Sequence, residues 1–248
     1  MKKVLVIGYG RFGELLCQIL SKDFKVSIYE KNKIKINKAK INKINIIDNL
    51  TALDSFSYIF ICVPISVFKE IVLEIKDKTN KNQIVFDVCS VKSYPAKIMT
   101  TYLKKPQIIA THPLFGPDSF GKSLDLRIVL CKLRVSEDNY REILDYLGSK
   151  SLSIIETTPL KHDHDIIYSQ AFTYIILNLI QNMNFPNITI NTPSYLKMKE
   201  ITDISINDSK QLFNDMLKFN PYFKEFYKKL KKGYKSSLKS LKIIAKSK

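Results

Sequence analysis

The chain has 248 residues, of which 45% are hydrophobic, and it carries a formal net charge of +17 at pH 7. This length allows a substantial core in one large domain or two modest ones, and the longest uncharged apolar stretch, residues 58–68, is too short to span a bilayer. Lysine outnumbers arginine 36 to 4 although arginine reads phosphates and bases better, so we interpret the charge as compositional bias and expect no nucleic-acid partner.

A glycine-rich turn follows the first predicted strand. Residues 2–7 are a compact apolar strand, residues 8–13 have the pattern GxGxxG, and helical periodicity follows. In this setting Gly8 makes the tight turn, Gly10 lets a pyrophosphate reach backbone N–H groups, and Gly13 permits close contact between helix and strand. The alternative is a glycine turn without a ligand. The pattern predicts a dinucleotide site whose cofactor contacts come from Gly8, Tyr9, Gly10, Arg11, Phe12 and Gly13.

An acidic residue ends the second predicted strand, residues 25–29. Glu30 lies 17 residues after Gly13, where a carboxylate accepts hydrogen bonds from the adenosine ribose hydroxyls. Its charge would repel a 2′-phosphate, so it predicts NAD as the cofactor. Lys31 and Lys33 favour NADP instead, which stays the alternative.

Strands and helices then alternate as far as residue 156. The expected helices are residues 32–43, 65–78, about 90–103 and 137–147, and the expected strands are 44–47, 57–62, 83–88, 108–111, 126–130 and 152–155. This alternation predicts a doubly wound parallel sheet of the Rossmann type, with ligands beyond the carboxyl ends of its strands. We assign residues 1–156 to this dinucleotide-binding domain.

Polar or turn-forming residues follow three of these strands. Val63 and Pro64 end one strand, Ser90 follows the next, and His112 follows the third. Because the carboxyl ends of parallel strands meet at one edge of a sheet, we expect these residues together beside the nicotinamide. Val63 and Pro64 are therefore further predicted cofactor contacts.

His112 is the strongest catalytic candidate. The strand before it is expected to stop at His112-Pro113, because proline cannot continue a ladder, and two glycines and a second proline follow. A histidine presented in this way can act as a general base, since its reference pKa is about 6.5. For an isolated His-Pro, a turn histidine with one backbone hydrogen bond is the usual alternative.

The segment after strand 83–88 offers a hydroxyl and an ammonium. We expect Ser90 to bind a substrate hydroxyl and to orient His112, while Ser90 or Ser93 alternatively caps the next helix. Lys92 suits a substrate carboxylate, with a solvated lysine at a helix start as the alternative.

The pattern changes after residue 156, and residues 157–248 are predicted to be an all-helical substrate and dimerisation domain. Thr158 is a candidate N-cap with Pro159 at the first helical position. A long buried helix is expected at 162–182, and the spacing of His162, Ser169 and Thr173 places them on one face. We predict that this face is a pocket wall where His162 and Thr173 bind substrate.

The chain ends with a lysine-rich amphipathic segment. Residues 222–248 contain ten lysines and one glutamate. Apolar residues recur there at steps of three or four, which predicts a helix that packs on another surface. A free basic arm for nucleic acid or an anionic membrane is the alternative. The four cysteines form no CxxC and lie in apolar segments, so we expect reduced thiols, a cytoplasmic location and no metal site.

Several motifs together resemble the prephenate/arogenate (cyclohexadienyl) dehydrogenases of tyrosine biosynthesis. They are GYGRFG, DVCSVK, THPLFGPDS and TTPLKHDHDIIYSQAFTY, between residue 2 and about residue 183. The resemblance implies that hydride passes to NAD(P)+ while a ring carboxylate leaves as CO2 and the ring becomes aromatic. It implies His112 as the base, Ser90 as a partner of the same substrate hydroxyl, and His162 in the lining of the cleft. It also implies a homodimer formed through the helical half.

Two departures from the family pattern concern the substrate. Tyr174 stands where the family commonly has a histidine, and residues 195–207 contain no arginine to clamp a substrate carboxylate. The keto-acid side chain of prephenate favours a bidentate cation, whereas Glu200 and Asp203 suit the ammonium of arogenate. We therefore expect arogenate to be used at least as well as prephenate. Other Rossmann-fold dehydrogenases, or an NAD-binding regulatory protein without turnover, are the alternatives.

Overall fold

The protein is described from a computed structural model, which covers residues 1–121, 125–186, 188–205 and 209–246. The chain forms two compact units, residues 1–162 and 163–248. The sequence predicts a boundary after residue 156, where the last strand ends. In the structure the first unit also includes the start of the helix that follows.

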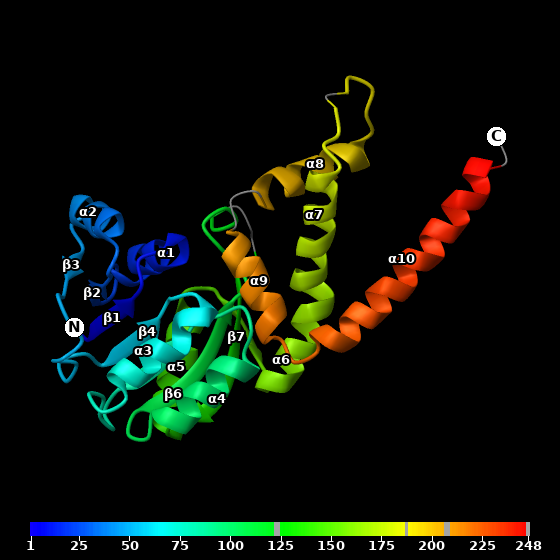
Figure 1. The fold of residues 1–248 in the computed structure, drawn as a ribbon. Coiled ribbons are helices and arrows are strands. Elements are labelled where there is room, and N and C mark those ends of the chain that lie inside the picture. Colours follow the sequence, from blue (N-terminus) through cyan, green and yellow to red (C-terminus); the bar gives the residue numbers. More distant parts are fainter. Residues whose placement is uncertain (122–124, 187, 206–208, 247–248) are drawn as a thin grey trace. The chain divides into compact units, whose positions relative to one another are not determined.

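An eight-stranded sheet forms the centre of the first unit (Figure 1). Its spatial order is β3-β2-β1-β4-β5-β6-β7-β8. The first strand, β1, therefore lies inside the sheet, with β2 and β3 on one side of it and the later strands on the other. The strands are β1 (Lys3–Ile7), β2 (Lys25–Tyr29), β3 (Asn45–Ile46), β4 (Tyr58–Ile61), β5 (Ile84–Asp87), β6 (Gln107–Pro113), β7 (Arg127–Arg134) and β8 (Ser153–Glu156).

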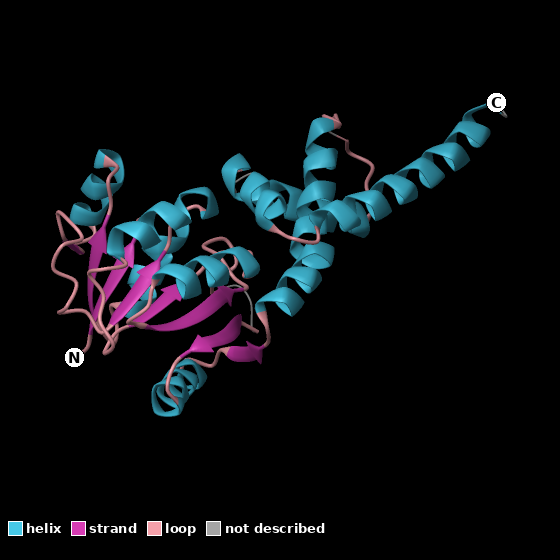
Figure 2. Ribbon diagram, turned by 60° about the horizontal axis from the view of Figure 1, so that its bottom comes forward, coloured by secondary structure: helices cyan, strands magenta, loops and turns pink. Residues whose placement is uncertain are grey.

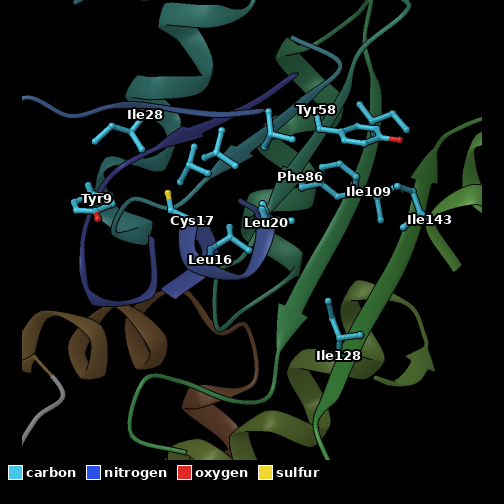
Figure 3. Close-up of a cluster of buried hydrophobic side chains, with 14 of the residues drawn as sticks. Tyr9, Leu16, Cys17, Leu20, Ile28, Tyr58, Phe86, Ile109, Ile128 and Ile143 are labelled. Atoms are coloured by element: carbon cyan, nitrogen blue, oxygen red, sulfur yellow. The ribbon is translucent and has the colours of Figure 1, made fainter. Parts of the chain in front are cut away.

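Helices cover both faces of this sheet (Figure 2). They are α1 (Arg11–Leu20), α2 (Lys33–Ile41), α3 (Ile65–Ile75), α4 (Ser93–Tyr102) and α5 (Glu137–Ser149). On one face Leu16 and Cys17 of α1 and Ile143 of α5 pack against side chains of the strands, among them Tyr58 and Phe86 (Figure 3). The alternate strand residues point to the other face and are also buried. A sheet buried on both faces explains the nearly continuous apolar strands.

The fully parallel sheet predicted from the sequence is wrong at one pair of strands. β6 and β7 are antiparallel, while the other neighbouring strands are parallel. A parallel pair needs a crossover connection, usually a helix. The described part of the segment 114–126 contains turns but no helix, so the chain returns alongside β6 in the opposite direction.

The predicted end of the strand at His112-Pro113 is confirmed, but both residues still belong to the paired strand. β6 runs through both residues, which pair with Val129 and Ile128 of β7. The N–H of Leu114 donates to the carbonyl of Arg127, so the nitrogen of Pro113 faces away from β7. On that other side β5 has already ended, opposite Ala110. Proline therefore removes no ladder hydrogen bond here.

The described part of the second unit is helical. The chain continues from α6 (Pro159–Ile166) through a π-helical turn, η1 (Ile167–Ala171), into α7 (Phe172–Asn182), followed by α8 (Pro193–Ser205), α9 (Lys210–Phe219) and α10 (Phe223–Lys246). None of the helices in the described residues is long and apolar enough to cross a membrane.

The apolar helix expected to be buried is only partly buried. In α7 Leu177 is buried, but Leu179 is 48% exposed and Phe172 is 39% exposed. The predicted helix at the C-terminus is confirmed as α10, and its Phe226 contacts the rings of Tyr168 and Phe172. Further along, Tyr234 and Leu241 are more than half exposed. The described helices of the second unit therefore leave some of its own apolar side chains exposed.

Candidate active site

Two glycines of the turn after β1 are required by close backbone contacts. Gly8 has φ +103°, and a Cβ there would lie 2.5 Å from the carbonyl oxygen of Cys62. A Cβ on Gly13 would lie 2.2 Å from the carbonyl oxygen of Gly8. The turn is therefore pressed against the end of β4, and α1 is pressed against the turn. This is the role that the sequence predicts for both residues.

Gly10 has a different environment. No atom lies within 4 Å of the position that its Cβ would take, and Gly10 is the N-cap of α1 without a side-chain hydrogen bond to the helix. The first N–H groups of a helix need acceptors and carry a partial positive charge. An uncapped helix start beside open space fits the pyrophosphate of a dinucleotide. Gly10 and the first turn of α1 would hold this group.

Glu30 stabilises the glycine-rich turn through hydrogen bonds to backbone N–H groups. Its carboxylate accepts the backbone N–H groups of Tyr9 at 2.8 Å and of Lys31 and Asn32 at 2.9 Å, and the ammonium of Lys35 lies 3.6 Å away. Burial opposes ionisation, but these donors outweigh it and lower the pKa of Glu30. Glu30 is thus an ionised support of the turn, and its predicted contact with ribose hydroxyls stays a prediction.

The other predicted cofactor residues also gather around the turn. Tyr9 is buried, and its hydroxyl accepts a hydrogen bond from the side-chain amide of Asn42 at 3.0 Å. The ring therefore helps to anchor the turn in the core. Val63 lies 3.1 Å from the position of a Cβ on Gly8, and Pro64 precedes α3 as its N-cap residue.

Arg11 and Phe12 connect the turn to the segment after His112. Arg11 forms an ion pair with Asp118 at 2.6 Å, and the ring of Phe12 lies 6.4 Å from that of Phe115. The structure therefore brings the glycine-rich turn and the HPLFGPD segment together. The sequence analysis did not predict a role for Asp118, although Asp118 is the last residue of the HPLFGPD motif.

His112 is buried at the end of β6 and faces a second histidine. Its Nδ1 lies 2.9 Å from Nε2 of His162 in α6, so one of these nitrogens donates a hydrogen to the other. Burial, followed by electrostatic interactions with His162 and Lys92, lowers the pKa of His112 well below its ordinary value of 6.5. The imidazole is therefore neutral at pH 7 and able to accept a proton.

The topology explains this contact across 50 residues. β6 pairs with β7, β7 pairs with β8, and α6 follows β8 after two residues. The N–H of Lys161 donates to the hydroxyl of Thr158 at 3.3 Å, which confirms the predicted N-cap. α6 thus begins beside the end of β6. Both histidines are predicted site residues, but their direct contact is not visible in the sequence.

Lys92 lies elsewhere than the sequence suggests. Its side chain is fully buried, forms an ion pair with Asp87 and donates to the carbonyl of Thr111. The alternative of a solvated lysine is wrong, and the ammonium that we predict to meet a substrate carboxylate is directed to protein groups. Sequence reasoning missed Asp87 as its partner, although a carboxylate at the end of an apolar strand is a usable signal.

The structure places Ser90 near the strand end without the expected contact. Ser90 follows β5 and is 9% exposed, and the described residues provide no hydrogen bond between its hydroxyl and His112. Lys92 is the N-cap residue of α4, without a side-chain cap, and Ser93 lies inside the helix with its hydroxyl donating to the carbonyl of Pro159 at 3.3 Å. The predicted serine cap is therefore wrong.

The common face of His162, Ser169 and Thr173 stays a prediction. The π-helical turn η1 interrupts the α-helical spacing on which this face depends. His162 is buried, whereas Ser169 and Thr173 are exposed and donate to the carbonyls of Asp165 and Ser169, each at 3.0 Å. The contact of Thr173 with a substrate stays a prediction.

A Rossmann-type sheet with an uncapped glycine-rich turn defines a nucleotide-binding domain. The sequence profile described as "Prephenate dehydrogenase, nucleotide-binding domain" matches residues 18–128, which include Ser90, Lys92 and His112. Residues 18–128 of the chain are thus similar to the nucleotide-binding domain of prephenate dehydrogenases. This confirms the resemblance that the motifs indicate.

Two relatives from Arabidopsis thaliana illustrate the similarity. Arogenate dehydrogenase 1, chloroplastic, is 25% identical over 234 residues, which cover 88% of this chain but 36% of the relative. Arogenate dehydrogenase 2, chloroplastic, is 24% identical over 249 residues, which cover 96% of this chain and 70% of the relative. The chain thus spans about a third of the first relative and about two thirds of the second.

A solved structure has the same fold. The crystal structure of prephenate dehydrogenase from A. aeolicus, in complex with hydroxyphenyl propionate and NAD+, has a TM-score of 0.73 and 20% sequence identity. The match covers 98% of this chain and 90% of the other.

Proposed function

We propose that the chain catalyses the NAD(P)-dependent oxidative decarboxylation of arogenate, prephenate or both. The products would be tyrosine from arogenate and 4-hydroxyphenylpyruvate from prephenate. The observation that carries the proposal is the neutral, buried His112 in contact with His162, in the same unit as a glycine-rich turn that fits a pyrophosphate. The names of the relatives support the substrate class.

His112 supplies the base in this reaction. Because its Nδ1 lies against His162, Nε2 is the ring nitrogen left for the substrate hydroxyl. In the tautomer with the ring hydrogen on Nδ1, His112 donates a hydrogen bond to Nε2 of His162. Its own Nε2 can then accept a proton from the substrate. Loss of the hydroxyl proton to His112 drives formation of the ring carbonyl. A bound nicotinamide dinucleotide supplies the hydride acceptor.

Formation of NADH with each substrate tests the function directly. With NAD+ present, we expect turnover of arogenate with a kcat/KM at least equal to that of prephenate, because residues 195–207 contain no arginine for a keto-acid side chain. A strong preference for prephenate would contradict this substrate choice. Turnover of neither substrate would overturn the proposed function.

We propose NAD as the preferred cofactor, with Glu30 as the determinant. Glu30→Gln keeps the size of the side chain but removes the charge that repels a 2′-phosphate, so it should narrow the ratio of kcat/KM for NAD+ over NADP+. Glu30→Ser should narrow it further, since Lys35, 3.6 Å from the carboxylate, is then released towards the phosphate. A wild-type enzyme that favours NADP+ would show that the lysines determine the choice.

The proposal extends to a homodimer in the cytoplasm. Exposed apolar side chains on α7 and α10, among them Leu179, Tyr234 and Leu241, support association through the helical unit. All four cysteines are free thiols, which supports a reducing compartment.

A further inference from the structure

A fully buried ion pair lies behind His112. Nζ of Lys92 pairs with Oδ1 of Asp87, which also accepts the backbone N–H of Cys89 at 3.0 Å. The second oxygen, Oδ2, is buried and has no hydrogen-bond partner in the described chain. A buried pair with an unsatisfied oxygen contributes little net stability compared with apolar residues of similar volume. Stability alone therefore does not account for this pair.

The pair is connected to the residue before His112. Lys92 donates to the carbonyl oxygen of Thr111, and the hydroxyl of Thr111 donates to the carbonyl oxygen of Asp87. The ladder between β5 and β6 ends at Asp87 and Ala110, so β6 has no strand on that side beyond this point. Lys92 thus takes the place of a strand partner for the part of β6 that carries His112.

We propose that Lys92 is a positioning residue: together with Asp87 it fixes the backbone of Thr111, and thereby the imidazole of His112, and it does not bind a substrate carboxylate. The proposal rests on the proposed function in one respect, namely that His112 acts as the base. It differs from a substrate-binding role because the ammonium is directed into the protein.

Electrostatics adds to this geometry. The charged or titratable groups around His112 are His162 from α6 and Lys92 after β5, with Asp87 as the partner of Lys92. After burial and His162, the charge of Lys92 is the next cause of the lowered pKa of His112. A buried ammonium thus favours the neutral imidazole that a base requires.

The test removes the pair without leaving an unpaired charge. In the double variant Asp87→Asn/Lys92→Met both charges are replaced by neutral groups of similar size, which proteins tolerate better than the loss of one partner. A misplaced base should lower kcat by roughly 10²-fold and leave the KM for arogenate and prephenate nearly unchanged. The control is Lys2→Met, which removes an ion-paired lysine next to the amino end of β1.

A titration of His112 makes the test independent of turnover. The chain has three histidines, so their imidazole resonances can be assigned with single His→Asn variants and followed against pH by NMR without any ligand. In the double variant we expect the pKa of His112 to rise, because Lys92 is one of the causes that lower it and Asp87 is not among them. If the wild type turns over neither substrate, the proposed function fails, and the role of Lys92 is still decided by this titration.

A milder variant covers the case in which the double variant does not fold. Thr111→Val removes the hydroxyl bond to Asp87, and Thr100→Val is the matched control because Thr100 also donates to a backbone carbonyl, that of Ala96 in α4. We expect kcat to fall in the first variant and not in the second. A raised KM with unchanged kcat and unchanged titration of His112 would overturn the proposal. Equal kcat values for the two threonine variants would overturn it as well.

Discussion

Replacing His112 by asparagine is expected to lower kcat by roughly 10²–10⁴-fold, the usual contribution of a general base. The affinity for NAD+ should barely change, because the glycine-rich turn and Glu30 are separate from His112 in the sequence and have their own contacts. Asparagine keeps a polar group near His162 but cannot take up a proton. Steady-state kinetics and NAD+ titration measure the two effects separately.

The matched control is His164→Asn. His164 is exposed and pairs with Asp165 at 3.0 Å, so its loss should leave kcat unchanged. If His112→Asn turns over at a nearly normal rate, His112 is not the base. Equal losses in both variants would point to a general effect on folding.

His112 should also determine how activity and folding stability change at acidic pH. The pKa of His112 is lowered, so log kcat/KM should be flat at neutral pH and fall only below about 6.5. The unfolded chain binds this proton more readily than the folded one, so folding stability also decreases as the pH falls from 6.5 through the lowered value. In His112→Asn this contribution to the pH dependence should disappear, as denaturation at several pH values would show.

Two glycine variants should have opposite consequences for folding and binding. Gly13→Ala places a Cβ 2.2 Å from the carbonyl of Gly8, so it should destabilise the protein by about 3 kcal/mol. Gly10→Ala meets no protein atom within 4 Å and should fold normally. Its methyl group occupies the space assigned to the pyrophosphate, so the Kd for NAD+ should rise at least about tenfold, or ~1.4 kcal/mol.

Thermal unfolding and NAD+ titration distinguish these effects. Gly148→Ala is the control, because Gly148 also has open space around its Cβ position and lies in α5, and it should change neither quantity. Undiminished NAD+ affinity in Gly10→Ala would show that the dinucleotide binds elsewhere.

Local patterns predicted most elements of the first unit. The strand at 25–29 has the predicted limits, and the glycine roles follow from spacing, because a strand, a tight turn and a helix leave few arrangements. The helical identity of residues 223–246 follows likewise from its apolar stripe. In each case the determining interactions are close in sequence.

The errors concern interactions between distant segments. Strand periodicity is the same in parallel and antiparallel pairs, so the direction of β7 is not encoded in its own sequence. A lysine is predicted to be exposed unless its partner is known, and Asp87 becomes the partner of Lys92 only after folding. The π-helical turn η1 is invisible to a rule that assumes 3.6 residues per turn.

The position of His112 inside a strand has a consequence for how the site is assembled. A base on a loop must be ordered when the substrate arrives, and that loss of conformational entropy weakens binding. His112 instead belongs to a paired element, opposite Val129, so its backbone is fixed when the sheet forms. The entropy of fixing the base is therefore part of the free energy of folding, and the binding energy of the substrate stays available for orienting the substrate itself.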